Sequence, residues 1–425
     1  MFDIDPKAIE QEFCFEEGKR WWNCPANRLP SVTKDFDLPE SVILKDETIR
    51  EGAVVPGRKP LSDMDLVKVA LAMDEAGMTE MEVGFTAAVD EHRELATLLK
   101  KEGVKMKQSA HTRGWAEDWK AEIDGVIQNG ADIVNLVCIG AVETEKFAYP
   151  HVKCKEDFGE LYAKQIEYIK SQGAYAAFIT STNNTRLDLI TQFHKQIGEA
   201  GVDRVYFADS FGSAIPETVK FMVYGIRDII GADTEVAVHV HNDFGLGTAN
   251  AVAAVTAGAK VVDVSINGLG DRGGMPSLDH VAATLETLYD VRTGVSMEHL
   301  KPLSDMVAEL WGFPVEPHRA VIGDNMYRHE TDMHIAALLS GMWYAYNVIK
   351  PETVGAESSL EFGPNALAKG DTSAVGTLIK LLGYKADTTQ FDQILDLIRE
   401  DIKGSDEGWA TQEQVAKRIN QVLGA

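Results

Sequence analysis

Short runs of β-branched and apolar residues alternate with longer amphipathic stretches between about residues 42 and 290. The amphipathic stretches often begin after Ser, Asp or Pro, which are typical residues at helix N-termini. Eight such pairs follow one another, with a mean repeat of roughly 31 residues, the length of one strand-loop-helix-loop unit. The predicted strands are 42–46, 79–85, 104–110, 132–138, 174–180, 204–208, 235–240 and 261–266.

Eight consecutive units without a hairpin signal predict an α/β fold, a (β/α)8 TIM barrel. A doubly wound open sheet is the alternative. The strand period ends near residue 295, so residues 1–40 are expected to form an N-terminal preamble, 41–295 the barrel and 296–425 a mostly helical C-terminal extension. Helices in the extension are expected at 301–312, 331–347, 373–383, 389–403 and 411–423.

The charge balance narrows the classes of partner. The chain has 41 Lys plus Arg against 66 Asp plus Glu, a net charge of 41 − 66 = −25. Because phosphate binding needs a basic face, this balance argues against partners such as nucleic acids and anionic membranes. The four cysteines share no CxxC spacing, no run of 18 apolar residues occurs, and the first twenty residues are acidic without the apolar segment of a signal peptide. A cytoplasmic protein with reduced thiols and no membrane segment is expected.

The strongest chemical signal is the seventh predicted strand, EVAVHVHND. Strand alternation turns Ala237, His239 and His241 toward the barrel interior, near the strand end where barrel sites lie. Alone, such a pair of histidines is structural about as often as it binds metal. The loop after the first strand, KDETIREG, ends with Arg50 and Glu51, and only strand eight separates strand one from strand seven. Two imidazoles and a carboxylate are therefore expected to converge, a set that suits Zn, Mn, Fe or Co and, less naturally, Mg.

Several motifs occur in an order and spacing compatible with one barrel. They are DETIREG at 46–52, ADSFGSAIP at 208–216, HVHNDFGLGTAN at 239–250, NGLGDRGG at 267–274 and RHETDMH at 328–334. The combination resembles the DRE-TIM metallolyase superfamily, in particular its Claisen-condensing branch of isopropylmalate, homocitrate and citramalate synthases. The resemblance covers roughly residues 40–385. It implies a homodimer in which the C-terminal subdomains cover the active site.

The resemblance also implies an activity: condensation of acetyl-CoA, or a related acyl-CoA, with a 2-oxo acid to a 2-alkylmalate-type product. Glu51, His239 and His241 match the residues that hold one divalent metal ion (Mg, Mn, Zn or Co), a Lewis acid that chelates the 2-oxo acid. Arg50 matches the arginine that stabilises the alkoxide formed when the acyl-CoA enolate attacks the keto carbon.

Further site residues follow from looser matches. His334, in HETDMH, matches a histidine of the base that removes the acyl-CoA α-proton. Tyr344 and Tyr346 both lie near the position of a subdomain tyrosine, and the spacing does not choose between them. The substrate-binding candidates are Arg113, which is accompanied by Asp118, Arg186, Ser210, and Asn267, which is expected to line the metal mouth with Asp271 and Arg272. For Arg186 the competing interpretation is a solvated arginine at a helix start.

The chain also departs from the usual pattern of these synthases. Ala53 and Val54 stand where the synthases have a carboxylate and an amide, and Thr182 replaces a glutamate implicated in proton transfer. Met275 replaces an asparagine that is a metal ligand in some members. These departures predict a divergent member with an altered 2-oxo acid, acyl donor or reaction direction.

Three other functions compete with condensation. Carbon-carbon cleavage, as in hydroxymethylglutaryl-CoA lyases, uses the same metal and enolate chemistry, but the segment GDRGG lacks the cysteine of that branch. The glycines 268, 270 and 273 match GxGxxG, a dinucleotide-binding pattern, but they close the eighth unit instead of opening a domain. A non-catalytic descendant that binds metal or a 2-oxo acid is the third alternative.

Overall fold

The computed structural model describes residues 18–89, 93–138, 158–181 and 185–424. Thr182, Cys14 and Cys154 lie outside these residues. The chain divides into two compact units: residues 26–315, and a second unit that combines described residues before 26 with those from 316 onward. Within the described residues no helix is long and apolar enough to cross a membrane, and both cysteines, Cys24 and Cys138, are free thiols.

The first unit is built on a closed parallel barrel in which the eight strands follow the order of the sequence. Strand β8 pairs back with β1, with Lys45 opposite Asp263 in the register. The predicted TIM barrel is therefore confirmed, and the open sheet is excluded. The strands are β1 (Ile43–Asp46), β2 (Glu80–Glu82), β3 (Lys107–Arg113), β4 (Ile133–Cys138), β5 (Tyr175–Ser181), β6 (Arg204–Asp209), β7 (Glu235–Val240) and β8 (Val261–Val264).

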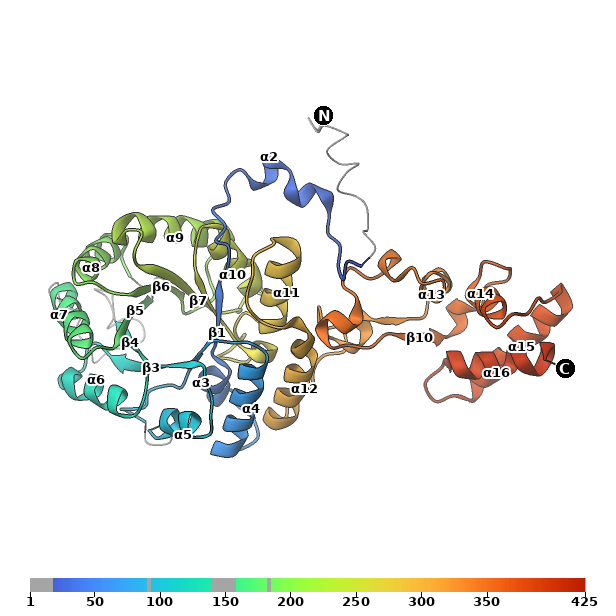
Figure 1. The fold of residues 1–425 in the computed structure, drawn as a ribbon, viewed down its shortest axis with the longest axis horizontal. Coiled ribbons are helices and arrows are strands. Elements are labelled where there is room, and N and C mark those ends of the chain that lie inside the picture. Colours follow the sequence, from blue (N-terminus) through green and yellow to red (C-terminus); the bar gives the residue numbers. More distant parts are fainter. Residues whose placement is uncertain (1–17, 90–92, 139–157, 182–184, 425) are drawn as a thin grey trace. The chain divides into compact units, whose positions relative to one another are not determined.

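Helices surround the barrel on its outside (Figure 1). Helix α4 shows why they start where they do, since Ser62 and Asp65 form a reciprocal capping box at its N-terminus. A four-residue helix, α2 (Pro30–Thr33), precedes the barrel. The others are α3 (Thr48–Ala53), α4 (Asp63–Glu75), α5 (Leu95–Lys101), α6 (Trp119–Gln128), α7 (Phe158–Ser171), α8 (Leu187–Glu199), α9 (Pro216–Ile230), α10 (Gly247–Thr256), α11 (Leu278–Leu288) and α12 (Leu300–Trp311).

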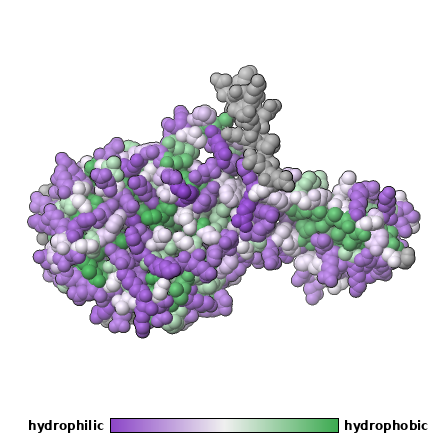
Figure 2. Space-filling model, in the orientation of Figure 1, coloured by the Kyte–Doolittle hydropathy of each residue, from purple (hydrophilic) through white to green (hydrophobic). Residues whose placement is uncertain are grey.

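Side chains fill the inside of the barrel. A buried apolar layer lies inside it, formed by Ile133, Ala177, Tyr206, Ala237 and Val261 from the consecutive strands β4 to β8. The inward position of Ala237 agrees with the alternation expected for β7, and it directs His239 to the same side of the strand. On the face shown in Figure 2, hydrophilic residues predominate and hydrophobic ones form separate small patches, in keeping with the strongly acidic composition.

A buried ionic cluster closes the N-terminal end of the barrel. The guanidinium of Arg204, the first residue of β6, lies 2.6 Å from a carboxylate oxygen of Glu80 and 2.8 Å from one of Glu235. The Tyr175 hydroxyl donates to the same Glu235 carboxylate at 2.7 Å. Because these residues begin their strands, the cluster lies at the end opposite to the one where barrel active sites occur.

The second unit combines helices with a small sheet in the order β11-β10-β9. Its strands are β9 (Arg328–His329), β10 (Ser359–Phe362) and β11 (Ala410–Thr411), and its helices are α13 (Asp332–Leu339), α14 (Ala374–Leu381), α15 (Thr388–Gly404) and α16 (Gln412–Leu423). The sequence did not predict this sheet, because strands of two to four residues are too short to show an alternating pattern.

Two details of the second unit differ from the sequence-based expectation. The helix expected over 331–347 ends at Leu339, since Gly341 adopts a φ of 81° that a helix cannot continue. The N-terminal preamble contributes to this unit, because Trp21 forms an antiparallel bridge with Ile349 and the Trp22 indole donates to the carbonyl of Asn347 at 2.8 Å.

Candidate metal centre and active site

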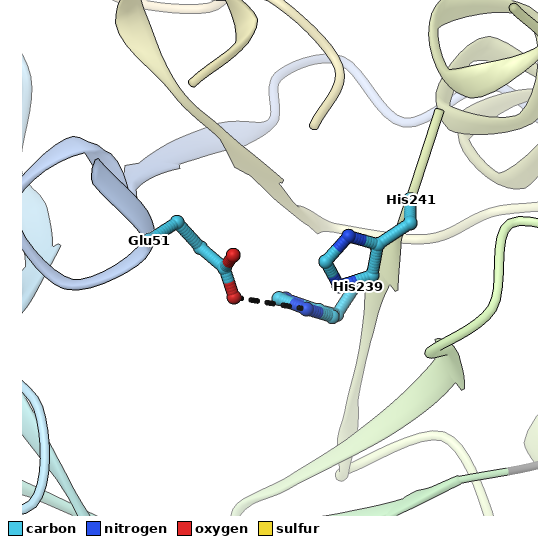
Figure 3. A group of neighbouring side chains, drawn as sticks. All are labelled: Glu51, His239 and His241. Atoms are coloured by element: carbon cyan, nitrogen blue, oxygen red, sulfur yellow. Dashed lines mark ion pairs between the residues drawn. The ribbon is translucent and has the colours of Figure 1, made fainter. Parts of the chain in front are cut away.

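Glu51, His239 and His241 meet at the C-terminal end of the barrel, as the spacing predicted. Glu51 lies in α3 after β1, His239 is the penultimate residue of β7, and His241 follows that strand. Figure 3 shows the carboxylate facing the two imidazoles. One potential ligand atom from each residue lies within 4.8 Å of the others, and the Glu51 Oε1 to His239 Nε2 distance is 4.0 Å. This separation exceeds a hydrogen bond and is compatible with donors around a shared ion.

Neighbouring loops hold Glu51 in place. The Thr48 hydroxyl, one turn earlier in α3, accepts a hydrogen bond of 2.8 Å from the backbone N–H of Ile266 after β8. The same loop returns to the carboxylate, where the N–H of Asp271 donates to Glu51 Oε2 at 3.1 Å. A Cβ at Gly270 would lie 3.1 Å from that oxygen. The middle glycine of the GxGxxG pattern thus allows close packing beside Glu51.

The two histidines have different electrostatic surroundings. Asp263 Oδ2 lies 2.9 Å from Nδ1 of His239, which leaves Nε2 on the side of Glu51. Burial acts to lower the pKa of His239, but the Asp263 carboxylate outweighs it and raises this pKa above its usual value. For His241, burial and the neighbouring His239 lower the pKa to about 4. His241 is therefore neutral at pH 7, the form in which an imidazole binds metal.

Buried carboxylates outnumber the permanent cations around these residues. Lys45 and Arg50 supply the positive charge, and the Arg50 guanidinium contacts the Glu51 carboxylate directly. The carboxylates are those of Glu47, Glu51, Glu82 and Asp263. In addition, Nδ1 of His241 is buried and has no hydrogen-bond partner among the described residues. Excess negative charge, an unpartnered imidazole nitrogen and a donor set of two imidazoles and one carboxylate all fit a divalent cation.

A cavity of ≈ 450 Å³ adjoins the three residues. Two residues expected in the site, Arg50 and Ser210, line it, and Asp271 and Arg272 lie at it as expected for the metal mouth. The sequence analysis missed the rest of its wall, although the inward alternation of β3 and β4 could have indicated part of it. These further lining residues include Phe85, His111, Trp115, Val137, Cys138 and Ile179.

Three of the expected substrate-binding residues do not line this cavity in the described part of the chain. The Arg113 guanidinium binds the Glu122 carboxylate, with Nε at 2.8 Å, and its expected partner Asp118 is not the one the structure shows. Arg186 pairs with Asp188 on an exposed turn, Nε to Oδ1 3.0 Å, and the Asn267 amide donates to the Ser304 carbonyl in α12 at 2.9 Å. Nearby polar partners determine where these side chains point, and the sequence pattern does not predict those pairings.

In the second unit the structure separates the two candidate tyrosines. The ring of Tyr346 stacks on His334 with centroids 3.6 Å apart, whereas Tyr344 packs edge-to-face against Trp343. His329 also contacts His334, with its Nδ1 3.4 Å from Nδ1 of His334. Tyr346 is therefore the tyrosine that contacts the predicted catalytic histidine.

Comparison with known proteins identifies the family. The model of the HMGL-like family matches residues 41–307, the barrel and the start of α12. The chain belongs to the HMGL-like family. Among curated proteins, this HMGL-like chain is 29% identical to homocitrate synthase of Methanopyrus kandleri, over 87% of the chain and 89% of that protein. It is 30% identical to (R)-citramalate synthase of Methanocaldococcus jannaschii, over 84% of the chain and 70% of that protein.

Solved structures share the fold of this HMGL-like protein. The hydroxymethylglutaryl-CoA lyase from Pseudomonas aeruginosa superposes with a TM-score of 0.56 at 17% identity, covering 67% of this chain and 97% of the lyase. At this level of identity the likeness concerns the barrel architecture alone.

Proposed function

We propose that this HMGL-like protein is a divalent-metal-dependent acyltransferase that condenses acetyl-CoA, or a related acyl-CoA, with a 2-oxo acid to a 2-alkylmalate-type product. One observation carries the proposal: Glu51, His239 and His241 converge beside a cavity at the C-terminal end of the barrel. The names of the relatives, homocitrate and citramalate synthases, support the reaction type.

Each residue at the cavity has a proposed task. Glu51, His239 and His241 would hold one ion of Mg, Mn, Zn or Co, which supplies Lewis-acid polarisation of the keto group. Arg50 lies at the same cavity with its guanidinium against Glu51, and it stabilises the negative charge that develops on the keto oxygen. The Ser210 hydroxyl is proposed to bind the carboxylate of the 2-oxo acid. Substrate binding is not proposed for Arg113, Arg186 or Asn267, whose side chains are held elsewhere.

The reaction balances without an oxidant or reductant. Loss of the α-proton gives the acyl-CoA enolate, whose carbon forms a bond to the keto carbon of the 2-oxo acid. The resulting alkoxide takes up a proton, and water then hydrolyses the thioester to release the CoA thiol. We assign removal of the α-proton to His334, assisted by the stacked Tyr346.

The oligomeric state and the cellular compartment of the protein are also proposals. We propose a homodimer in the cytoplasm, on the basis of the resemblance and the cysteine usage of the chain. Size-exclusion chromatography with light scattering at micromolar concentration checks the first part, and a monomer would contradict it.

A thiol-release assay tests the activity directly. The protein is incubated with acetyl-CoA, Mg or Mn, and 2-oxo acids from glyoxylate to 2-oxoglutarate, and the metal content of the same preparation is measured. Release of thiol with one acid is expected and would name the substrate. His318→Ala, which alters an exposed histidine, serves as a control and should retain full release. Bound metal without release from any acid would contradict condensation and favour cleavage.

A further inference from the structure

A buried lysine lies beneath the cavity, within a group of carboxylates. Lys45 on β1 is 0% exposed, and its Nζ lies 2.7 Å from Glu47, 3.2 Å from Glu82 and 3.7 Å from Asp263. The ring centroid of Tyr206 lies 5.4 Å from the same nitrogen. A fully buried ammonium loses its hydration, so it is tolerated only where several partners of opposite charge surround it.

One side of this group reaches the candidate metal centre. Asp263, the residue opposite Lys45 in the register of β8 and β1, uses one oxygen toward Lys45 and the other toward Nδ1 of His239, at 2.9 Å. This hydrogen bond fixes the ring of His239 so that Nε2 is presented to the side of Glu51. A carboxylate bound to the far nitrogen of a metal-binding imidazole orients that ligand and increases its basicity.

The other side of the group reaches the wall of the cavity. Glu82 Oε2 forms an ion pair with Lys45 Nζ at 3.2 Å and accepts a hydrogen bond of 2.6 Å from the Ser109 hydroxyl, while Oε1 lies 3.0 Å from Nδ1 of His111. The Asn135 amide also donates to Glu82. With Nδ1 held in this way, the opposite nitrogen of His111 is the one left for a ligand, and His111 lines the cavity together with His239.

We propose that Lys45 is a positioning residue for two imidazoles of the cavity, His239 and His111. It acts on the first through Asp263 and on the second through Glu82. His111 is then a polar substrate contact on a wall that is otherwise largely apolar and aromatic. The His111 part rests on the proposed function, since it assigns a contact to the 2-oxo acid, whereas the His239 part requires only that the site binds a metal ion.

The single buried charge of Lys45 faces both Asp263 and Glu82, and through them it orients two imidazole rings. A neutral side chain at position 45 would leave Glu82 and Asp263 buried without their shared cation, and either carboxylate could then turn toward other donors. A side chain that only filled space could be replaced by one of similar length without changing metal or ligand binding. The two possibilities therefore predict different outcomes for Lys45→Met, which keeps the length of the stem.

The experiment measures binding on the full chain loaded with Co²⁺, whose visible absorption reports the ligand geometry. Asp263→Asn should weaken Co²⁺ binding by about 10- to 100-fold and shift the Co²⁺ spectrum. Glu82→Gln should leave Co²⁺ affinity within about twofold, and it should raise the dissociation constant of the chelating probes pyruvate and 2-oxoisovalerate by roughly tenfold. Both probes are titrated without acyl-CoA, so turnover is not needed.

Lys45→Met should weaken the binding of both Co²⁺ and the probes. Arg204→Met provides the matched control. Arg204 is also a buried cation between carboxylates, but at the opposite end of the barrel, so its variant should lose stability without changing either binding constant. The proposal is overturned if Lys45→Met changes neither the dissociation constant of Co²⁺ nor that of the probes. It is also overturned if Asp263→Asn and Glu82→Gln change the same one of these two constants. If Lys45→Met does not fold, the two carboxylate variants decide alone.

Failure of the proposed function can be told apart from failure of this inference. A wild-type protein that binds Co²⁺ and the probes but releases no thiol with any 2-oxo acid contradicts condensation. In that case Lys45→Met, compared with the separate effects of the Asp263 and Glu82 variants on binding, still tests the role of Lys45.

Discussion

We expect the buried His194 to make the stability of the barrel unit sensitive to mild acid. This side chain of α8 is 0% exposed, its Nδ1 lies 2.6 Å from the carbonyl oxygen of Ile190, and its ring meets Phe178 edge-to-face at 5.8 Å. Its Nε2 is buried, and in the part of the chain that the structure describes it has no hydrogen-bond partner. Burial therefore disfavours the imidazolium and lowers the pKa of His194 from 6.5 to about 4.

The sign and size of the effect follow from proton linkage. The imidazole takes up a proton near pH 6.5 in the unfolded chain but only near pH 4 in the folded one, so the unfolded state binds more protons between these values. Stability is lost as the pH falls from 6.5 toward 4, and this group causes no further loss below that. At about 1.4 kcal/mol per pKa unit, the loss is about 2 kcal/mol at pH 5 and about 3 kcal/mol in total.

The variant His194→Phe keeps an aromatic ring against Phe178 and removes the titrating group. Urea unfolding of both proteins at pH 7 and pH 5 should show a wild-type loss that exceeds the variant's by about 2 kcal/mol. The histidines of the metal centre are common to both proteins and cancel in the difference. The half-buried His299, changed to Gln, is the control and should behave like the wild type. Equal losses in wild type and His194→Phe would refute the reasoning.

Four further outcomes are expected. His241→Ala should lose bound metal and turnover together, because two donors make a poor chelate, and metal analysis of the purified variant checks this. His334→Ala should keep its metal and lose about 100-fold or more in turnover; loss of metal would contradict the division of roles. Arg204→Met should destabilise the barrel by about 3–5 kcal/mol in urea, since Glu80 stays buried and unpaired, against about 0–1 kcal/mol for Arg227→Met, which removes a cation whose partner Asp37 is exposed. Removal of the metal with a chelator should lower the free energy of unfolding by about 2.7 kcal/mol, relative to protein in a free metal concentration of 100 times the dissociation constant. A shift in melting temperature measures this loss.

The sequence by itself determined the barrel and the meeting of its three donor residues. Alternating strands and helices in eight consecutive units leave few topologies, and parallel strands in order bring their C-terminal ends to one edge. The positions of His239 and His241 within β7, and of Glu51 just after β1, were therefore sufficient to place them together. The side of β7 on which His239 and His241 lie depends on the local geometry of the strand, and the alternating sequence pattern predicts that geometry well.

Only the tertiary structure decided which polar groups face one another. Arg113 turns to Glu122, and Lys45 shares Glu82 and Asp263 from its two neighbouring strands. No periodicity encodes such pairs, because partner choice depends on distances between residues far apart in the chain. The short strands of the second unit and its bridge between Trp21 and Ile349 escaped the sequence for the same reason: a pairing of one to four residues is stabilised by long-range contacts, and it leaves no repeating pattern to detect.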